Sequence, residues 1–270
     1  MEDIKENKEP GPELKNFRIS PKTIELLRTQ NITSFFPIQQ KTFDLIYDGK
    51  DIMGRDLTGS GKTLAYCLPL IEHLRQSKTI EPDKKRENRS PLIIIIVPTR
   101  ELVLQVNAVL NSIKHSNEFQ VSAVYGGVSV EGQAEVLRKG VEVVVGTTGR
   151  LLDHLERGNL KVNSLRCVVL DEADRMLDMG FQEDVEKIFE YIHGSKDGRK
   201  ASSPQCLLFS ATFPNWVKRV SVKYLDPKFT QVDLVKNLSN KTVSAVKHLA
   251  LFCPYANRMS ILADISNYLY

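Results

Sequence analysis

The fold of this chain is decided by one short stretch, Asp56-Leu57-Thr58-Gly59-Ser60-Gly61-Lys62-Thr63. It is a glycine-rich loop that ends in Gly-Lys-Thr, and the residues after it have the pattern of an apolar helix. Such a loop turns several backbone N–H groups toward a phosphate, and its lysine reaches the terminal phosphates of a nucleotide. The residues expected to hold these phosphates are Thr58, Gly59, Ser60, Gly61, Lys62 and Thr63.

A second motif, Asp171-Glu172-Ala173-Asp174, follows the apolar stretch 167–170. Adjacent acids are equally well explained as the acidic start of a helix, but the upstream phosphate loop favours magnesium. We expect Asp171 and the Thr63 hydroxyl to hold Mg²⁺, partly through water, while Glu172 orients or deprotonates the attacking water. ATP and Mg²⁺ are therefore the expected cofactors, and the expected catalytic residues are Lys62, Asp171 and Glu172.

Composition sets broad limits on the kind of protein. The chain has 270 residues, of which 41% are hydrophobic and 26% charged, an ordinary balance for a globular protein. A net charge of +4 is compatible with a nucleic-acid partner but does not indicate one. The longest aliphatic run, 92–97, is too short to cross a bilayer, so we expect no membrane association. Four scattered cysteines without a C-x-x-C pair favour a reducing compartment.

Apolar stretches alternate with helical patterns from about residue 50, which predicts an α/β fold with a parallel sheet between helices. Expected strands are 51–54, 92–97, 120–125, 142–145, 167–170, 205–209 and 230–234. Expected helices are 63–75, 100–114, 130–139, 150–157, 181–192 and 216–225. We expect a disordered lead-in over 1–15, the ATP-binding domain over 16–240, and a linker with the truncated start of a second domain over 241–270. That start consists of a strand at 248–253 and a helix at 257–268.

Two polar segments, 77–91 and 194–204, are expected to be surface loops. Their lysine and arginine clusters are more simply explained as solvated insertions than as RNA contacts.

Further motifs stand where other expected strands end. They are Pro98-Thr99-Arg100-Glu101-Leu102, Gly126-Gly127, Thr147-Thr148-Gly149-Arg150 and Ser210-Ala211-Thr212. Glycine and hydroxyl residues beside an arginine can bind a phosphodiester backbone. Each motif by itself is more often a turn or a helix cap.

The joint order of these motifs, from the phosphate loop through the literal D-E-A-D to S-A-T, resembles the DEAD-box RNA helicase family over nearly the whole chain from Phe17. The resemblance implies a RecA-like fold and an adenine-reading glutamine, for which Gln39 is the match. It also implies an aromatic stacked on adenine, for which Phe17 is the candidate; a buried anchor for the N-terminal segment is the alternative. The RNA-binding residues that it implies are Pro98, Thr99, Arg100, Gly126, Gly127, Thr147, Gly149 and Arg150. The residues that it implies couple the two sites are Asp174, Ser210 and Thr212.

The resemblance also implies a biological setting. The sequence looks most like the RNA helicase II/Gu branch, which implies a nuclear or nucleolar location and ribosomal RNA or ribonucleoprotein remodelling. Apart from this branch resemblance, the expected location is cytoplasmic. A second RecA-like domain would close on ATP and RNA, and RNA would be gripped by its backbone with low sequence specificity. We expect the 270-residue chain itself to be a monomer.

Three departures from the family pattern have consequences. Asp56 stands where the family usually has alanine; a carboxylate at ~6 Å would repel a triphosphate by about 3 kcal/mol unless it points to solvent. Thr148 replaces a proline and brings a hydroxyl that could contact RNA. Without the second domain's arginines, which are worth about 10³–10⁵ in rate, the chain alone should hydrolyse ATP very slowly.

Two other functions remain as alternatives. A non-enzymatic RNA-binding or scaffold module with impaired ATP use would explain Asp56 and Thr148, but the intact Lys62 and Asp171 oppose it. A DNA helicase or another RecA-like ATPase is disfavoured by the D-E-A-D sequence and by Gln39.

Overall fold

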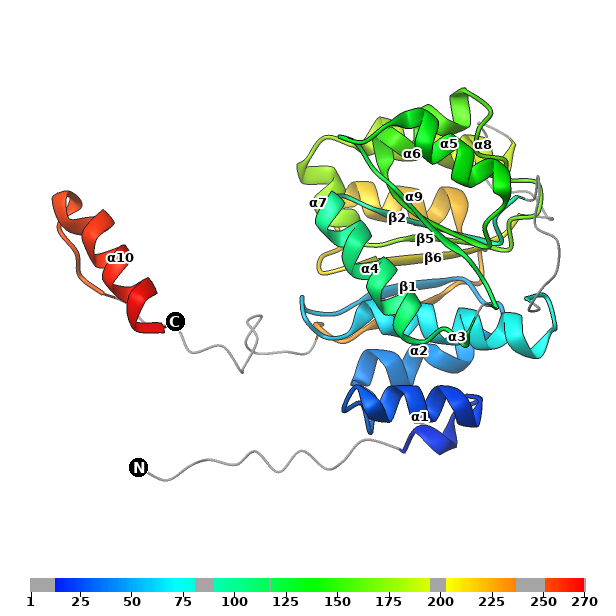
Figure 1. Ribbon diagram of the computed structural model, residues 1–270, viewed down its shortest axis with the longest axis horizontal. Helices are drawn as coiled ribbons and strands as arrows, with labels where there is room; N and C mark the ends of the chain where they lie inside the picture. The colour runs from blue at the N-terminus through cyan, green and yellow to red at the C-terminus, as the bar shows by residue number, and fades with distance from the viewer. Residues whose placement is uncertain (1–12, 81–89, 117, 195–202, 237–250, 270) are drawn as a thin grey trace. The chain divides into compact units, whose positions relative to one another are not determined.

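A computed structural model describes residues 13–80, 90–116, 118–194, 203–236 and 251–269 (Figure 1). The chain divides into two compact units, Met1–Asn237 and Leu238–Tyr270. The second unit contains, in its described part, η2 (Tyr255–Asn257) and α10 (Arg258–Leu269). Among the described residues, no helix combines the length and the apolar character that crossing a bilayer requires.

The first unit is built on a seven-stranded sheet in the order β3-β4-β2-β5-β6-β1-β7, and all of its strand pairs are parallel. The strands are β1 (Ile52–Arg55), β2 (Ile93–Val97), β3 (Val121–Val124), β4 (Val143–Thr147), β5 (Cys167–Leu170), β6 (Gln205–Ser210) and β7 (Thr230–Asp233). The central strands β2 and β5 are buried throughout, as expected for a parallel sheet covered on both faces.

Helices pack on both faces of this sheet (Figure 1). Ile93 and Ile95 of β2 belong to one core cluster, whereas Ile94 and Ile96 belong to the other, because side chains alternate along a strand. The first cluster includes residues of η1 (Leu14–Asn16), α1 (Pro21–Thr29), α2 (Pro37–Tyr47), α3 (Lys62–Gln76) and α4 (Arg100–Ser112). The second includes residues of α5 (Val130–Lys139), α6 (Thr148–Glu156), α7 (Ala173–Asp178), α8 (Gln182–His193) and α9 (Asn215–Tyr224).

The predicted α/β architecture is therefore correct, while α1, α2 and α7 are additional helices that the alternation of patterns did not predict. The prediction for the second unit is correct in part. Its helix is present as α10, but Leu251–Cys253 form no strand, and residues 248–250 of the expected strand lie outside the described residues.

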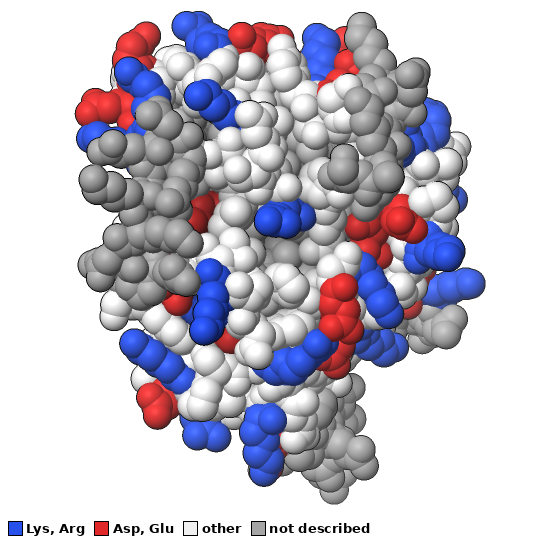
Figure 2. Space-filling model, turned by 90° about the vertical axis from the view of Figure 1, so that its right-hand side faces the viewer, with Lys and Arg blue, Asp and Glu red and all other residues white. Residues whose placement is uncertain are grey.

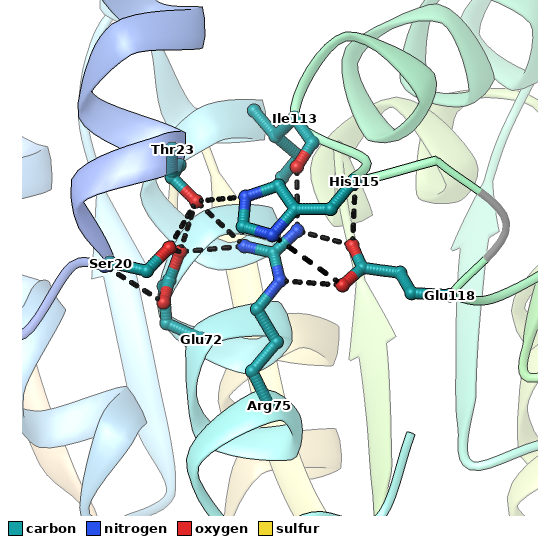
Figure 3. Close-up of polar contacts among 7 residues, drawn as sticks. All are labelled: Ser20, Thr23, Glu72, Arg75, Ile113, His115 and Glu118. Atoms are coloured by element: carbon teal, nitrogen blue, oxygen red, sulfur yellow. Dashed lines mark hydrogen bonds and ion pairs between the residues drawn. The ribbon is translucent and has the colours of Figure 1, made fainter. Parts of the chain in front are cut away.

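A buried polar network fixes the N-terminal helix α1 to α3 (Figure 3). Arg75 lies at its centre, where it forms an ion pair of 2.6 Å with Glu72 and a second ion pair with Glu118. Arg75 also donates to the Thr23 hydroxyl of α1 at 2.8 Å, and this hydroxyl contacts Nε2 of His115 at 2.8 Å. Because a buried charge is tolerated only when it is paired, this network constrains how α1 sits on α3, the helix that follows the phosphate loop.

Charged side chains on the face shown in Figure 2 are interspersed. Lysines and arginines stand singly among neutral residues, and aspartates and glutamates lie between them. The described residues of this face form no continuous basic patch, so surface charge gives no reason to place RNA there.

Candidate nucleotide-binding site

The strand order separates two groups of motifs along the carboxyl edge of the sheet. The phosphate loop follows β1, the D-E-A-D motif follows β5, and the S-A-T motif lies at the end of β6, which is between them. The motifs at 98–102, 126–127 and 147–150 follow β2, β3 and β4, which are also neighbours. Ligands of open α/β sheets bind at this edge, so one half of it suits a nucleotide and the other half a second ligand.

The phosphate loop has a conformation that its glycines allow. Gly59 and Gly61 have φ angles of 80° and 83°, in the left-handed region that favours glycine. At Gly61 a Cβ atom would also lie 2.4 Å from Nε2 of Gln39, so a side chain is excluded there by contact as well as by backbone strain. Helix α3 begins at the next residue, Lys62, and its N-terminus faces the loop.

The Lys62 ammonium is folded back onto its own loop. Its Nζ atom donates hydrogen bonds to the carbonyl oxygens of Asp56 at 2.9 Å and Leu57 at 2.7 Å, and the side chain is almost fully buried. A phosphate would have to replace these carbonyls as the partner of the ammonium. A pocket of about 250 Å³ lies beside this lysine, lined by Thr58, Lys62, Glu172, Asp174, Arg175, Asp178 and Ala211.

Asp171, which precedes the pocket-lining Glu172 in the sequence, is a buried carboxylate, 5% exposed. Its Oδ2 accepts a hydrogen bond of 2.9 Å from the Tyr66 hydroxyl, and its Oδ1 accepts one of 2.9 Å from the Glu172 N–H. Burial raises the pKa of Asp171 to about 6, although the Tyr66 hydroxyl, the Lys62 charge and the Glu172 N–H each lower it.

Glu172 has a strained backbone, with φ 53° and ψ 46° at the start of α7. The left-handed conformation costs free energy in residues other than glycine, and residues with such backbone strain are concentrated at functional sites. Its Oε2 lies 3.2 Å from Nη1 of Arg175, and the side chain lines the pocket. Glu172 therefore combines a strained backbone with a side chain that lines the pocket beside Lys62.

The donor set fits magnesium. Among the described residues there is no cluster of three or more His, Cys, Asp or Glu that could form a metal cage. Mg²⁺ is usually held by one or two carboxylates together with substrate phosphates and water, and one buried carboxylate beside a phosphate loop satisfies this requirement.

Asp174, Ser210 and Thr212 form one hydrogen-bonded group. The Asp174 N–H donates to Oγ of Ser210 at 3.1 Å. Oδ2 of Asp174 accepts from the Thr212 N–H at 2.8 Å and from the Thr212 hydroxyl at 2.9 Å. The D-E-A-D and S-A-T motifs are thus joined directly at the edge of the pocket.

Gln39 bridges α2 and the phosphate loop. Its Oε1 accepts from the Phe36 N–H at 2.9 Å, and its Nε2 donates to the Gly61 carbonyl at 3.0 Å. Phe17 lies farther into the core, with its ring centroid 4.8 Å from Phe35 and 5.2 Å from Phe43. This packing supports the alternative in which Phe17 is a buried anchor for the N-terminal segment. The residue is only half-buried, so part of its surface remains accessible.

Asp56 does not point to solvent. The residue is only 8% exposed, and its Oδ1 accepts a hydrogen bond of 2.8 Å from the Leu57 N–H. The carboxylate is therefore a fixed part of the loop, and the orientation that would have removed its repulsion from a phosphate is absent here.

On the other half of the edge, Arg100 and the glycine pair approach each other. The Arg100 guanidinium carbon lies 4.9 Å from the centre of the Tyr125 ring. A Cβ atom built on Gly127 would lie 3.9 Å from Nη1 of Arg100. Thr99 caps α4 by accepting from the Leu102 N–H at 3.4 Å, and Pro98 is buried. Gly126 and Gly127 are exposed, so their backbone is accessible to a large ligand.

Arg150 is committed to contacts within the protein. Its Nη1 donates to the Val128 carbonyl at 2.9 Å and to Oε1 of Gln133 at 2.9 Å. Oε1 of Gln133 also contacts Nε2 of His154 at 3.1 Å, and Nε2 of Gln133 donates to the Tyr125 carbonyl at 3.1 Å. Arg150 and Gln133 therefore tie α6 to the glycine loop. Thr147, the last residue of β4, is half-buried, and Gly149 in the first turn of α6 is exposed.

The expectation that the Thr148 hydroxyl contacts RNA is wrong for this structure. The residue is 1% exposed, and its Oγ1 is buried without a hydrogen-bond partner among the described residues. Thr148 is the first residue of α6, where its side chain turns into the protein and away from the ligand-facing edge.

Two residues at this edge were not predicted from the sequence. Tyr66 reads as an ordinary apolar position of α3, and only its spacing of three from Thr63 places both on one helix face. No sequence pattern indicates Gln133, because its hydrogen bonds join segments that are separate in the sequence.

The sequence model of the DEAD/DEAH box helicase family matches residues 36–220. The chain belongs to this family. It is 43% identical over 251 residues to mouse "ATP-dependent RNA helicase DDX50", covering 93% of this chain and 33% of that protein. It is 40% identical over 252 residues to rat "Nucleolar RNA helicase 2", covering 93% of this chain and 31% of that protein. The predicted family is thus confirmed, and the non-enzymatic alternative is not favoured.

A solved DEAD-box protein from Methanococcus jannaschii has the same architecture. The TM-score is 0.70 at 32% identity, over 82% of this chain and 55% of that one. The predicted RecA-like fold is therefore confirmed. The chain spans about a third of the length of the curated DEAD-box relatives that it matches.

Proposed function

We propose that this chain is the N-terminal ATPase core of an ATP-dependent DEAD-box RNA helicase. It binds Mg-ATP and the RNA backbone and, together with a second RecA-like domain, separates short RNA duplexes. The proposal rests on one observation: Lys62 and Glu172, from two separate motifs, line a single pocket beside the phosphate loop, and the buried Asp171 carboxylate accepts a hydrogen bond from the Glu172 N–H. The names of the relatives, which include "ATP-dependent RNA helicase", support it.

Each residue of the pocket has a separate task in this proposal. Lys62 exchanges the carbonyls of its own loop for the β- and γ-phosphates, and Gln39 pairs with adenine. Asp171 and Thr63 would hold Mg²⁺, which when bound would supply positive charge to neutralise the phosphates. Glu172 orients or deprotonates the attacking water.

RNA would bind at the other half of the sheet edge. Arg100, the amides of Gly126, Gly127 and Gly149, and the hydroxyls of Thr99 and Thr147 face the phosphodiester backbone, with Pro98 shaping the turn. Arg150 acts chiefly by holding the glycine loop, because its Nη1 is already occupied. Contacts to the backbone carry no sequence information, so specificity would be low. Asp174, Ser210 and Thr212 join the two halves and would couple the phosphate site to RNA.

Other parts of the proposal concern the protein's setting. Residues 241–270 form a linker and the start of the second RecA-like domain. The 270-residue chain is a monomer. The protein acts on ribosomal RNA or ribonucleoproteins in the nucleus or nucleolus. The location is supported by the nucleolar relatives. Light scattering of the purified chain measures its oligomeric state, and a fluorescent fusion shows its location.

The test is ATPase activity of the chain alone, with RNA, and with RNA plus a matched second domain. We expect very slow hydrolysis by the chain alone and strong RNA-stimulated turnover once the second domain is added, since its arginines are worth about 10³–10⁵ in rate. Lys62→Ala is the negative control. Rapid RNA-stimulated turnover by the chain alone, or none after the second domain is added, would contradict the proposal.

A further inference from the structure

Tyr66 is a fully buried phenol that lies next to the residues proposed to hold magnesium. It stands on α3, four residues after Lys62 and three after Thr63. Its hydroxyl donates to Oδ2 of Asp171 at 2.9 Å, which links α3 to the end of β5. The ring packs on Phe209 of β6 with 5.4 Å between centroids, so the hydroxyl has little freedom to move.

This hydrogen bond completes the fixation of the Asp171 carboxylate. Its other oxygen, Oδ1, accepts from the Glu172 N–H at 2.9 Å. With one donor on each oxygen, rotation of the carboxylate about its Cβ–Cγ bond would break both hydrogen bonds. Each oxygen accepts two hydrogen bonds when unhindered, so one lone pair on each remains for a metal or for metal-bound water.

The Tyr66 hydroxyl is the donor in this hydrogen bond, because an ionised carboxylate can only accept. Thr63, the second residue proposed to hold the metal, stands three residues earlier on the same face of α3. Tyr66 therefore connects the helix that carries Thr63 to the Asp171 carboxylate.

We propose that Tyr66 is a positioning residue that sets the orientation of Asp171 for Mg²⁺ in the proposed nucleotide site. This inference rests on the proposed function, because it assigns a role toward the metal that accompanies the nucleotide. Mutation of groups that orient metal ligands typically costs about 10–100-fold in metal affinity or activity. Tyr66 touches the proposed ligand Asp171 and does not line the pocket.

The test compares Tyr66→Phe with the unmodified chain in nucleotide binding, with and without Mg²⁺. Phenylalanine keeps the ring and removes only the hydroxyl. The affinity for a fluorescent ADP is measured in EDTA and at increasing Mg²⁺, and Mn²⁺ binding is followed by electron paramagnetic resonance. We expect unchanged affinity in EDTA and about tenfold weaker metal binding, the lower end of the usual effect of residues that orient metal ligands.

Tyr224→Phe is the matched control. Tyr224 is a second buried tyrosine, stacked on Phe189 in the core on the opposite face of the sheet. Removing its hydroxyl should leave both metal and nucleotide affinities unchanged. Thermal melting of both variants checks that they are folded.

The outcomes separate the inference from the function on which it rests. Metal affinity of Tyr66→Phe equal to that of the unmodified chain overturns the inference and leaves the proposed function intact. Loss of nucleotide affinity in EDTA as well shows a general structural role for Tyr66 and also overturns it. An unmodified chain whose nucleotide binding is indifferent to Mg²⁺ overturns both.

Discussion

Replacing Asp171 by asparagine should stabilise the protein at neutral pH while removing the metal-dependent part of nucleotide binding. The carboxylate is buried, and burial raises its pKa from an ordinary 3.8 to about 6. An acid with a raised pKa in the folded state destabilises that state wherever the unfolded chain has already lost the proton. The loss of unfolding free energy caused by the buried Asp171 charge is therefore absent below pH 3.8. It grows between pH 3.8 and 6 and is constant above that range.

The size of the effect follows from this pKa. A change from 3.8 to about 6 corresponds to about 3 kcal/mol of unfolding free energy at pH 8, and to about 1 kcal/mol near pH 4.5. Asparagine keeps an acceptor for the Glu172 N–H and carries no charge. We therefore expect the stability advantage of Asp171→Asn over the unmodified chain to be about 2 kcal/mol larger at pH 8 than at pH 4.5.

Urea unfolding at the two pH values measures this difference, with nucleotide affinity in Mg²⁺ and in EDTA as a second readout. Glu172→Gln is a suitable control, because this neighbouring carboxylate is more exposed than Asp171. An advantage that is equal at both pH values, or an asparagine variant that is less stable at pH 8, would refute the reasoning that burial of this charge is costly.

Three further predictions concern other residues. Asp56→Asn keeps an acceptor for the Leu57 N–H and removes a fixed negative charge near the phosphates. Nucleotide affinity, measured by fluorescence titration, should therefore be equal or tighter, by up to about a hundredfold. A clear loss of affinity would show that the carboxylate helps to bind the nucleotide. Thr148→Val replaces a buried hydroxyl without a described partner, so urea unfolding should show no loss of stability and a gain of up to about 1 kcal/mol. Arg75→Met removes the guanidinium that pairs with the buried carboxylates of Glu72 and Glu118, so it should cost about 3–5 kcal/mol of unfolding free energy. Arg157→Met removes an exposed ion pair with Asp153, and melted alongside it should change the stability much less.

The strand–helix alternation and the phosphate loop could be predicted because their signals are local. Buried parallel strands are continuous apolar runs, and a Gly-Lys-Thr loop requires its particular residues at fixed spacing. Helices α1 and α2 were missed although Pro21 and Pro37 stand at their first positions, a usual signal for the start of a helix. Helix α7 has only six residues, too few to show a periodic pattern.

Side-chain partnerships could not be predicted, because they join segments that are distant in the sequence. Nothing near Lys62 indicates that its ammonium bonds the carbonyls of Asp56 and Leu57, nor does any local pattern show that Thr148 turns inward. The bond between Tyr66 and Asp171 spans 105 residues and depends on the strand order β5-β6-β1. Sequence motifs therefore indicated which residues gather at the sheet edge, and the fold determined how they are paired.

The most direct test of the proposed site is a crystal structure of this chain with Mg²⁺ and a non-hydrolysable ATP analogue. We predict that Lys62 leaves the carbonyls of Asp56 and Leu57 to contact the β- and γ-phosphates, with the metal beside Asp171 and Thr63 and the adenine at Gln39. A nucleotide bound elsewhere, with Lys62 still bonded to its own loop, would contradict the proposal.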